Sequence, residues 1–236
     1  MKKINIAIIP ARGGSKRIPK KNIKNFLGKP IIAYSINTAI ESNLFDRIVV
    51  STDSREIAKI AEQYGAEVPF IRPKEYSDDF IGTHEVIGHA VKWLEHKKEI
   101  IDYTCCIYPT APLINTDDLI KGFKLIKTGK WDSVIAATTY SYPIFRSFKK
   151  VSGEGLKMIF PKYYKSRSQD LPTIYHDAGL FYWAKSKVWK KKSKGFNKKN
   201  FIVEIPNHRV QDIDTLDDWQ NAEIAYKILN KKNKTK

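Results

Sequence analysis

The sequence has very few cysteines and no long apolar run, and each scarcity excludes a class of protein. Its two cysteines, Cys105 and Cys106, are adjacent within an apolar stretch, which argues against a disulfide framework and against a zinc site. No apolar stretch approaches the roughly 18–20 residues that a membrane-spanning helix requires, so we do not expect a membrane protein. The first residues lead directly into a strand-like segment rather than a signal-peptide core, which favours a cytoplasmic location.

Arginine is also scarce, although the chain is strongly basic. Lys and Arg total 42 against 25 Asp and Glu, a formal net charge of +17, but only 8 of the 42 are arginines. A basic surface suggests a nucleic-acid-binding module as one alternative. Arginine, however, is the side chain that forks onto phosphates, and the lysine excess concentrates in residues 185–199 and 231–236. The pattern therefore favours a solvated, lysine-rich surface and an anionic small-molecule substrate, with no nucleic acid.

What is present is an ordinary globular composition with a regular alternation of segments. Apolar residues make up 42% and charged residues 28% of 236 positions, a length typical of one domain. Strand-like segments are expected over residues 4–9, 48–51, 104–108 and 133–138. Helical segments are expected over residues 31–43, 55–64, 83–98 and 116–128. This alternation predicts an α/β fold with a mostly parallel, Rossmann-like sheet covered by helices on both faces.

The second half of the chain is less regular. Strand-like segments at residues 143–149 and 156–160 flank Gly153-Glu154-Gly155 and predict a hairpin or an excursion from the main sheet. Further strands are expected over residues 179–184 and 201–205, and a closing helix over 215–229. No composition shift separates two domains. We therefore expect a single domain over residues 1–229, with an excursion at about 140–178 and a disordered basic tail at 230–236.

A glycine-containing basic loop follows the first strand, where residues 8–22 read IIPARGGSKRIPKKN. Gly13 and Gly14 allow the backbone to approach a phosphate closely, and the flanking arginine and lysines supply cationic donors. The pattern is neither a Walker A motif nor the Rossmann glycine fingerprint. Ligands of such sheets bind at the carboxyl ends of the strands, where this loop lies. The alternative interpretation is a solvated basic turn.

Two later stretches also contain residues with a possible chemical role. Asp212 and Asp214, two positions apart, project to one side of an extended segment and can share a hard cation, whereas capping of the following helix is the alternative. Thr83 either reads a base edge or caps its helix. His84 and His89 do not fit a zinc motif, because a five-residue spacing separates them by roughly 140° around a helix.

Residues 164–183 predict a site for an acidic, polar ligand. Arg167 is a natural bidentate partner for a carboxylate. Tyr175 and Asp177 precede an aromatic strand that can wall a pocket, although most of its aromatics are expected in the core. Asp53 and Ser54, which follow a strand, are interpreted as the cap of the next helix.

These motifs resemble those of the cytidylyltransferases that activate nonulosonic acids, the sialic-acid-like CMP-sugar synthetases. The resemblance extends to about Tyr226 and includes Arg72-Pro73 with Asp79 and Thr83 downstream, residues 108–113 (YPTAPL) and residues 211–215 (QDIDT). It implies one nucleotide-binding domain of the nucleotide-diphospho-sugar transferase type, with a small excursion that mediates homodimerisation. Segments including residues 176–179 (HDAG) most closely resemble the branch of this family that acts on pseudaminic acid, although Leu180 stands where that branch has glutamine.

The resemblance also implies a reaction and a set of site residues. CMP passes from CTP to the anomeric hydroxyl of pseudaminic acid and pyrophosphate leaves; N-acetylneuraminic, legionaminic and 3-deoxy-octulosonic acids are alternative acceptors. The implied catalytic residues are Arg12, Lys16, Lys21 and Asp214, and the implied Mg²⁺ ligands are Asp212 and Asp214. The implied nucleotide-binding residues are Ala11, Arg12, Gly13, Gly14, Asn22, Arg72 and Thr83. The implied sugar-binding residues are Tyr108, Arg167, Gln169, Tyr175 and Asp177. The sequence identifies no general base.

Overall fold

The computed structural model describes residues 2–192 and 195–234. Its main sheet has six strands in the order β10-β6-β9-β5-β1-β4. Their bounds are Ile4–Pro10 (β1), Arg47–Ser51 (β4), Ile101–Ile107 (β5), Ser133–Thr139 (β6), Tyr175–Lys185 (β9) and Asn200–Glu204 (β10). Strand β9 runs antiparallel to its neighbours β5 and β6, whereas the other pairings in this sheet are parallel. The predicted α/β fold with a mostly parallel sheet is confirmed.

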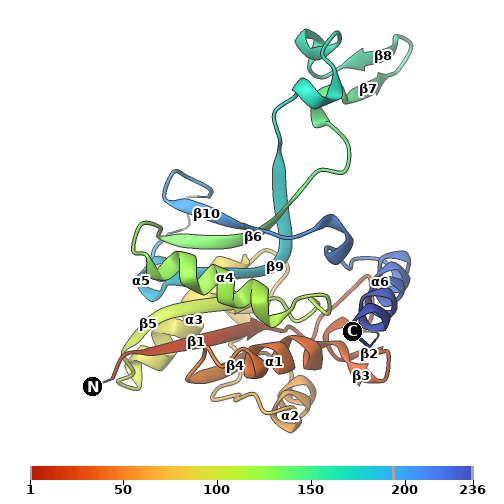
Figure 1. Ribbon diagram of the computed structural model, residues 1–236. Helices are drawn as coiled ribbons and strands as arrows, with labels where there is room; N and C mark the ends of the chain where they lie inside the picture. Colours follow the sequence, from red (N-terminus) through yellow and green to blue (C-terminus); the bar gives the residue numbers. More distant parts are fainter. Residues whose placement is uncertain (1, 193–194, 235–236) are drawn as a thin grey trace.

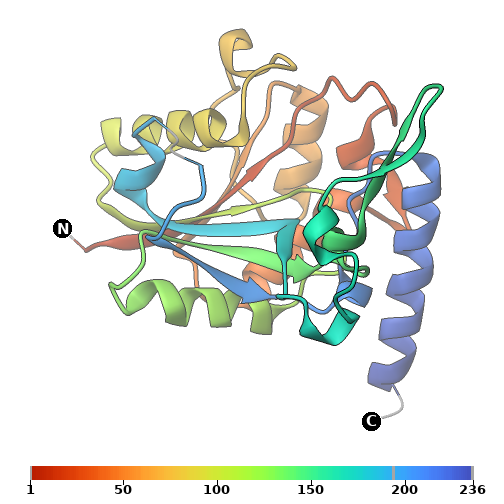
Figure 2. The ribbon, with the colours of Figure 1, turned by 90° about the horizontal axis from the view of Figure 1, so that it is seen from above.

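Helices cover both faces of this sheet (Figure 1). Their bounds are Ile31–Glu41 (α1), Arg55–Gln63 (α2), Thr83–His96 (α3), Thr116–Lys127 (α4), Ser186–Trp189 (α5) and Leu216–Lys234 (α6). Apolar side chains of α1, α2 and α4 belong to one core cluster, and those of α3 and α5 to another. Figure 2 shows α3 and α4 on opposite sides of the sheet.

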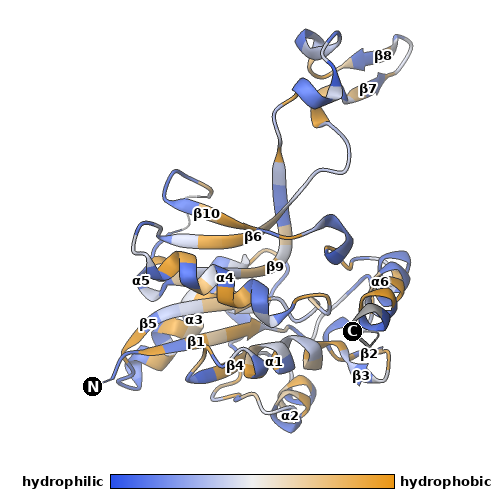
Figure 3. Cartoon of the chain, in the orientation of Figure 1, coloured by the Kyte–Doolittle hydropathy of each residue, from blue (hydrophilic) through white to orange (hydrophobic). Residues whose placement is uncertain are grey.

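The alternation of side chains along β1 explains why two cores form. Ala7 and Ile9 pack into the cluster with α1 and α4, whereas Ile6 and Ile8 pack into the cluster with α3. Successive side chains of a strand point to opposite faces, so a continuous apolar run is expected where helices cover both faces. Figure 3 shows apolar residues along the central strands and the inward helix faces.

The excursion between β6 and β9 projects away from this body (Figure 1). It contains the antiparallel strands Phe148–Val151 (β7) and Gly155–Met158 (β8), which form the predicted hairpin. Three short 3₁₀ turns accompany it: Ile144–Arg146, Pro161–Tyr163 and Ser168–Asp170. The hairpin is shorter than the strand-like segments suggested, because Ile144–Arg146 forms one of these turns.

Two helix ends differ from the sequence-based expectations. Helix α6 continues to Lys234 rather than ending at residue 229, because Lys and Asn are compatible with a helix that tertiary packing has already started. The last two residues of the expected tail lie outside the described residues. Gly82 rather than Thr83 is the N-cap of α3, and Thr83 is the first helical residue. In the part of the chain that the structure describes, no helix is long and apolar enough to cross a membrane.

Candidate active site

A pocket of about 480 Å³ lies at the carboxyl ends of β1 and β5. The loop after β1, the segment that follows Arg72 and the first turn of α3 form its walls. Parallel strands end at the same edge of a sheet, which is why segments distant in sequence meet there. The expected site residues that line it are Arg12, Lys16, Lys21, Asn22, Arg72, Thr83 and Tyr108.

Two of the pocket's cations share one carboxylate. Arg12 Nη1 donates to Asp79 Oδ1 at 2.5 Å, and the Lys16 ammonium donates to Asp79 Oδ2. The same Nη1 lies 3.3 Å from the backbone oxygen of Asp78. The hydrogen bonds from Lys16 and Arg12 hold the pKa of Asp79 below its usual value. These cations are therefore held in place by a carboxylate of the protein itself.

Two further cations of the pocket, Arg17 and Lys21, lie beside the predicted acidic pair. Asp214 Oδ1 is 2.8 Å from Arg17 Nη2 and 3.3 Å from Lys21 Nζ, and Lys21 also donates to the carbonyl of Ile213 at 2.5 Å. Ile213 itself is buried in the cluster that includes α6. Desolvation, followed by the charge of Asp214, raises the pKa of Asp212. The two carboxylates therefore lie close enough to repel each other, which a bound cation would relieve.

Capping of α6 is performed by other residues. Asp218 Oδ2 accepts hydrogen bonds from the backbone N–H groups of Asp214, at 3.1 Å, and Thr215, at 2.8 Å. The hydroxyl of Thr215 in turn accepts from the N–H of Asp218 at 3.2 Å. This reciprocal arrangement satisfies the free donors of the helix start. The side chains of Asp212 and Asp214 therefore take no part in the cap.

Two carboxylates beside a cationic pocket fit a magnesium ion of the substrate-bridging kind. Among the described residues, no group of three or more His, Cys, Asp and Glu side chains is placed to hold a metal. Magnesium is usually bound by one or two carboxylates together with substrate phosphates and water, rather than by a complete protein cage. The donor set at Asp212 and Asp214 matches this pattern.

A family model described as Cytidylyltransferase matches residues 6–204. The chain belongs to the cytidylyltransferase family. It is 45% identical over 224 residues to the pseudaminic acid cytidylyltransferase of Campylobacter jejuni, covering 95% of this chain and 97% of that one. A Helicobacter pylori protein named as pseudaminic acid cytidylyltransferase and UDP-2,4-diacetamido-2,4,6-trideoxy-beta-L-altropyranose hydrolase is 38% identical, over 88% of this chain and 40% of its own.

The fold is shared with solved structures of lower sequence identity. A CMP:2-keto-3-deoxy-manno-octonic acid synthetase complexed with CTP superposes with a TM-score of 0.69 at 16% identity. The match covers 94% of this chain and 98% of that one. At this identity the likeness supports the fold of the cytidylyltransferase and nothing finer.

The glycine loop of this cytidylyltransferase is built differently from the expectation. Of the two residues expected to cap α2, Ser54 does so, whereas Asp53 Oδ1 accepts from the N–H of Gly13 at 2.8 Å. The Gly13 amide is therefore engaged by protein and not open to a phosphate. A Cβ at Gly13 would lie 3.1 Å from Ser54 Cβ, so a tight packing contact also favours glycine here. Gly14 has open space around it.

Two residues expected to bind the nucleotide, Ala11 and Asn22, form hydrogen bonds with backbone groups of the protein. Ala11 is fully buried, and its N–H donates to Ser51 O at 2.9 Å, so its side chain lies in the core. Asn22 is also buried, and its side-chain amide donates to the carbonyl of Arg12 at 2.9 Å. Asn22 therefore holds the loop after β1 in place. Neither arrangement is visible in the sequence, because each depends on which backbone group lies nearby.

Arg72, Thr83 and Tyr108 form another part of the pocket wall. Arg72 is only 4% exposed; its guanidinium lies 3.9 Å from Asp53, and its Nε has no hydrogen-bond partner among the described residues. Burial lowers the pKa of Arg72. The hydroxyls of Thr83 and Tyr108 lie 3.0 Å apart, and burial raises the pKa of Tyr108 to about 12. Neutral hydroxyls and a buried guanidinium suit the edge of an uncharged base.

The expected sugar-binding residues are only partly brought together. Tyr108 and Asp177 both line a second pocket of about 510 Å³, which shares Thr83 and Tyr108 with the first. Asp177 is already bonded there: its Oδ1 accepts from Gly179 N at 2.8 Å, and its Oδ2 accepts from the Tyr182 hydroxyl. The two pockets adjoin at Thr83 and Tyr108, whose hydroxyls are hydrogen-bonded to each other.

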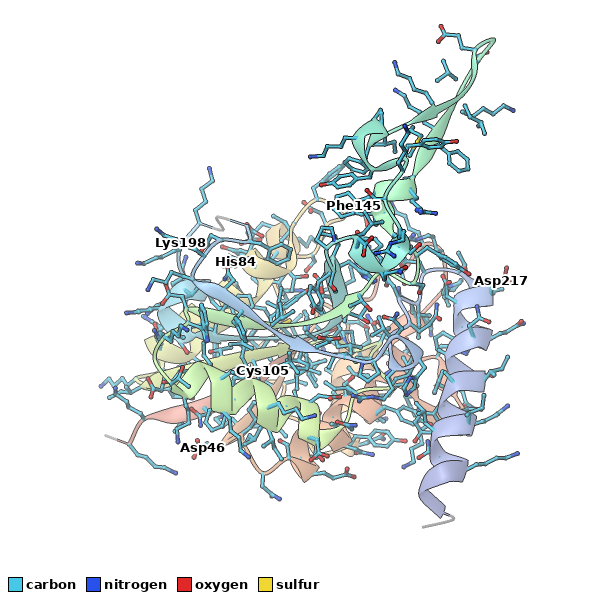
Figure 4. The ribbon with its side chains drawn as sticks, turned by 45° about the horizontal axis from the view of Figure 1, so that its top comes forward. Asp46, His84, Cys105, Phe145, Lys198 and Asp217 are labelled. Atoms are coloured by element: carbon cyan, nitrogen blue, oxygen red, sulfur yellow. The ribbon has the colours of Figure 1, made fainter. Side chains whose placement is uncertain are left out.

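The remaining expected sugar residues lie elsewhere. Arg167 pairs with Asp170 at 2.8 Å and, like Gln169, belongs to the excursion rather than to either pocket. In Figure 4 the excursion, marked by Phe145, extends beyond the sheet and helices. Tyr175 donates from its hydroxyl to Glu204 at 3.2 Å. Within one chain these residues do not converge on the pocket.

Three further positions complete the comparison with the sequence. Leu180, where a polar residue was expected from the resemblance, is buried in the core. His84 bonds to the carbonyl of Lys191, whereas His89 packs against Phe70 and Tyr76, so the two histidines are separate as expected.

Proposed function

We propose that this cytidylyltransferase transfers CMP from CTP to the anomeric hydroxyl of pseudaminic acid and releases pyrophosphate. The observation that carries the proposal is that a cationic pocket lies beside the acidic pair Asp212 and Asp214. Lys21 connects the two, because it lines the pocket and forms an ion pair with Asp214. The acceptor is supported by 45% identity, across 95% of the chain, to a protein named for pseudaminic acid.

Two groups of pocket residues orient the nucleotide. We expect Arg72, Thr83 and Tyr108 to contact the cytosine, because they offer a buried guanidinium donor and hydroxyls that both donate and accept. Arg12 and Lys16, with Lys21 nearer the acidic pair, are to bind the triphosphate. Cations in fixed positions neutralise the charge that develops on the departing pyrophosphate, which is the main requirement of nucleotidyl transfer.

Asp212 and Asp214 are to hold Mg²⁺, which supplies charge neutralisation at the phosphates when it is bound. Desolvation and the charge of Asp214 raise the pKa of Asp212, so its charged form is destabilised in the free protein. A bound cation would stabilise that charged form. Lys21 is hydrogen-bonded to the intervening carbonyl of Ile213 and keeps this segment next to the pocket. Tyr108 and Asp177 are to face the acid sugar in the adjoining pocket.

A homodimer is part of the same proposal. The excursion exposes large apolar side chains: Phe148 at 61%, Leu156 at 69% and Tyr164 at 73%. Exposed apolar groups concentrated on one small projection are typical of an interaction surface. We assign this surface to a second copy of the chain, whose pocket would then receive Arg167 and Gln169. Sedimentation velocity that finds only a monomer at working concentrations would exclude this arrangement.

The decisive experiment is a pyrophosphate-release assay with CTP and Mg²⁺. Pseudaminic acid is compared with N-acetylneuraminic, legionaminic and 3-deoxy-octulosonic acids. We expect turnover chiefly with pseudaminic acid. Release with none of the four acids contradicts the reaction, and preference for another acid corrects the acceptor.

The metal role is tested with Asp214→Ala. We expect turnover to fall by roughly 100-fold or more, because a lost charge-neutralising ion is worth several kcal/mol in the transition state. Asp217→Ala is the matched control, since Asp217 lies three residues further on, at the exposed start of α6 (Figure 4). Unchanged turnover of Asp214→Ala at saturating Mg²⁺ contradicts the assignment.

A further inference from the structure

The loop that carries Asp79 forms part of the pocket wall beside Arg12 and Lys16. Its Asp79 carboxylate is bonded to both Arg12 and Lys16, and the carbonyl of Asp78 accepts a further hydrogen bond from Arg12. Asp78, Asp79, Arg12 and Lys16 all line the pocket. The anionic partner of Arg12 and Lys16 is therefore a carboxylate of the protein itself, that of Asp79.

The local geometry of the loop presents Asp79 in this position. Asp78 Oδ1 accepts from the N–H groups of Phe80 and Ile81, both at 2.8 Å, which closes a tight turn. Ser77 anchors the preceding residues by donating to Pro73 O at 2.9 Å. The side chain of Phe80 is 94% exposed and adds no packing against the body. The tip of the loop is thus attached mainly through charge.

We propose that Asp79 occupies, in the free protein, the place that the terminal phosphates of CTP take, and that these phosphates must displace it. The inference rests on the proposed placement of the triphosphate at Arg12 and Lys16. Carboxylate and phosphate oxygens use the same cationic donors, so both anions compete for them. A triphosphate brings more charge and more acceptor oxygens than one carboxylate and therefore displaces it.

This competition acts on a defined class of ligand. CTP and pyrophosphate carry the phosphates that need Arg12 and Lys16, so Asp79 lowers the affinity of both. CMP lacks these phosphates and is indifferent to the displacement. Asp79 thereby limits inhibition by the released pyrophosphate, because the carboxylate can reoccupy the cations as pyrophosphate leaves.

The test is Asp79→Asn, with calorimetric titration of CTP, pyrophosphate and CMP at constant ionic strength. The variant should bind CTP and pyrophosphate more tightly by a factor between about 2 and 30, the range supplied by two partly exposed ion pairs. The affinity for CMP should remain unchanged. Asp102→Asn is the matched control: it makes the same charge change at the other end of β5, where Asp102 lies 3.9 Å from Lys3.

Each other outcome overturns the inference. Unchanged or weaker binding of CTP by Asp79→Asn means that Asp79 does not compete with phosphate. Equal tightening for CMP, or an equal effect of Asp102→Asn, indicates a general change of charge instead. Arg12→Ala separates the two proposals: if it weakens CTP binding while Asp79→Asn has no effect, the triphosphate placement stands and the competition fails. If it leaves CTP binding unchanged, the placement itself fails.

Discussion

Replacement of Arg209 by methionine should destabilise the protein strongly, because it removes the partner of a buried carboxylate. Arg209 and Asp118 form a bidentate pair, with Nη1–Oδ2 at 2.5 Å and Nη2–Oδ1 at 2.8 Å. The side chain of Asp118 is 1% exposed, and that of Arg209 is 13% exposed. Asp118 also completes the capping box of α4 with Asn115. The pair therefore joins the start of α4 to the segment that leads into Asp212.

The magnitude follows from this burial. Removing one member of a buried pair costs about 3–5 kcal/mol, because the remaining charge is stranded. A chain of this length loses about 2–4 °C per kcal/mol, so the Tm should fall by about 6–20 °C. The double variant Asp118→Asn/Arg209→Met should recover much of this loss, since no uncompensated charge remains.

Thermal unfolding followed by circular dichroism measures these differences. Lys2→Met is the matched control, because Lys2 forms a similarly short pair with Asp46, at 2.8 Å, while its side chain is 81% exposed. An exposed pair contributes little, and the control should unfold within about 2 °C of the wild type. A fall of less than about 3 °C for Arg209→Met, or a double variant as unstable as the sum of the single ones, would refute the reasoning.

Two further predictions concern titrating groups. The pKa of Asp212 is raised by desolvation and by Asp214, so the charge of Asp212 destabilises the fold at neutral pH. Asp212→Asn should therefore raise the Tm without metal and abolish any stabilisation by Mg²⁺. An unchanged Tm in thermal unfolding would contradict this. The pKa of His89 is lowered from 6.5 by burial and by Arg72, so the unfolded chain binds more protons and stability is lost as the pH falls below about 6.5. His89→Phe should reduce this acid-side loss of Tm; an identical pH profile would exclude His89 as its source.

The sheet was largely predictable from sequence, whereas the direction of β9 was not. Continuous apolar runs between short loops indicate buried strands, and the parallel pairing of β1 with β4 and β5 follows from their alternation with helices. Strand β9 comes after the excursion and enters antiparallel between β5 and β6. Hydrophobic periodicity states that a segment is a strand, but it carries no information about its neighbours or its direction.

The site was predictable where function depends on residue type, and less so where it depends on local contacts. The cations of the loop after β1 line the pocket as expected. The roles of Asp53 and Asp79 were missed, because these carboxylates are 40 and 67 positions from the groups that they bind. Asp118 offered a local signal, since Asn115 three residues before it forms a capping box, but its ion pair spans 91 positions.

The pairing of the site's charges suggests why the pocket can hold so many cations. Arg12 and Lys16 form ion pairs with Asp79. Arg17 and Lys21 form ion pairs with Asp214, and Arg72 lies near Asp53. Neighbouring cations repel one another, and an interleaved carboxylate lowers that cost in the free protein.

The carboxylates nevertheless differ in what a ligand can do to them. Asp53 is fixed by the Gly13 amide and faces a buried guanidinium, so it is suited to keep its place. Asp79 is more than one-third exposed and stands on a surface loop, so an incoming triphosphate can replace it without disturbing the core. The net charge of +17 therefore says little about affinity; what matters is which of the paired cations a polyanion can take over.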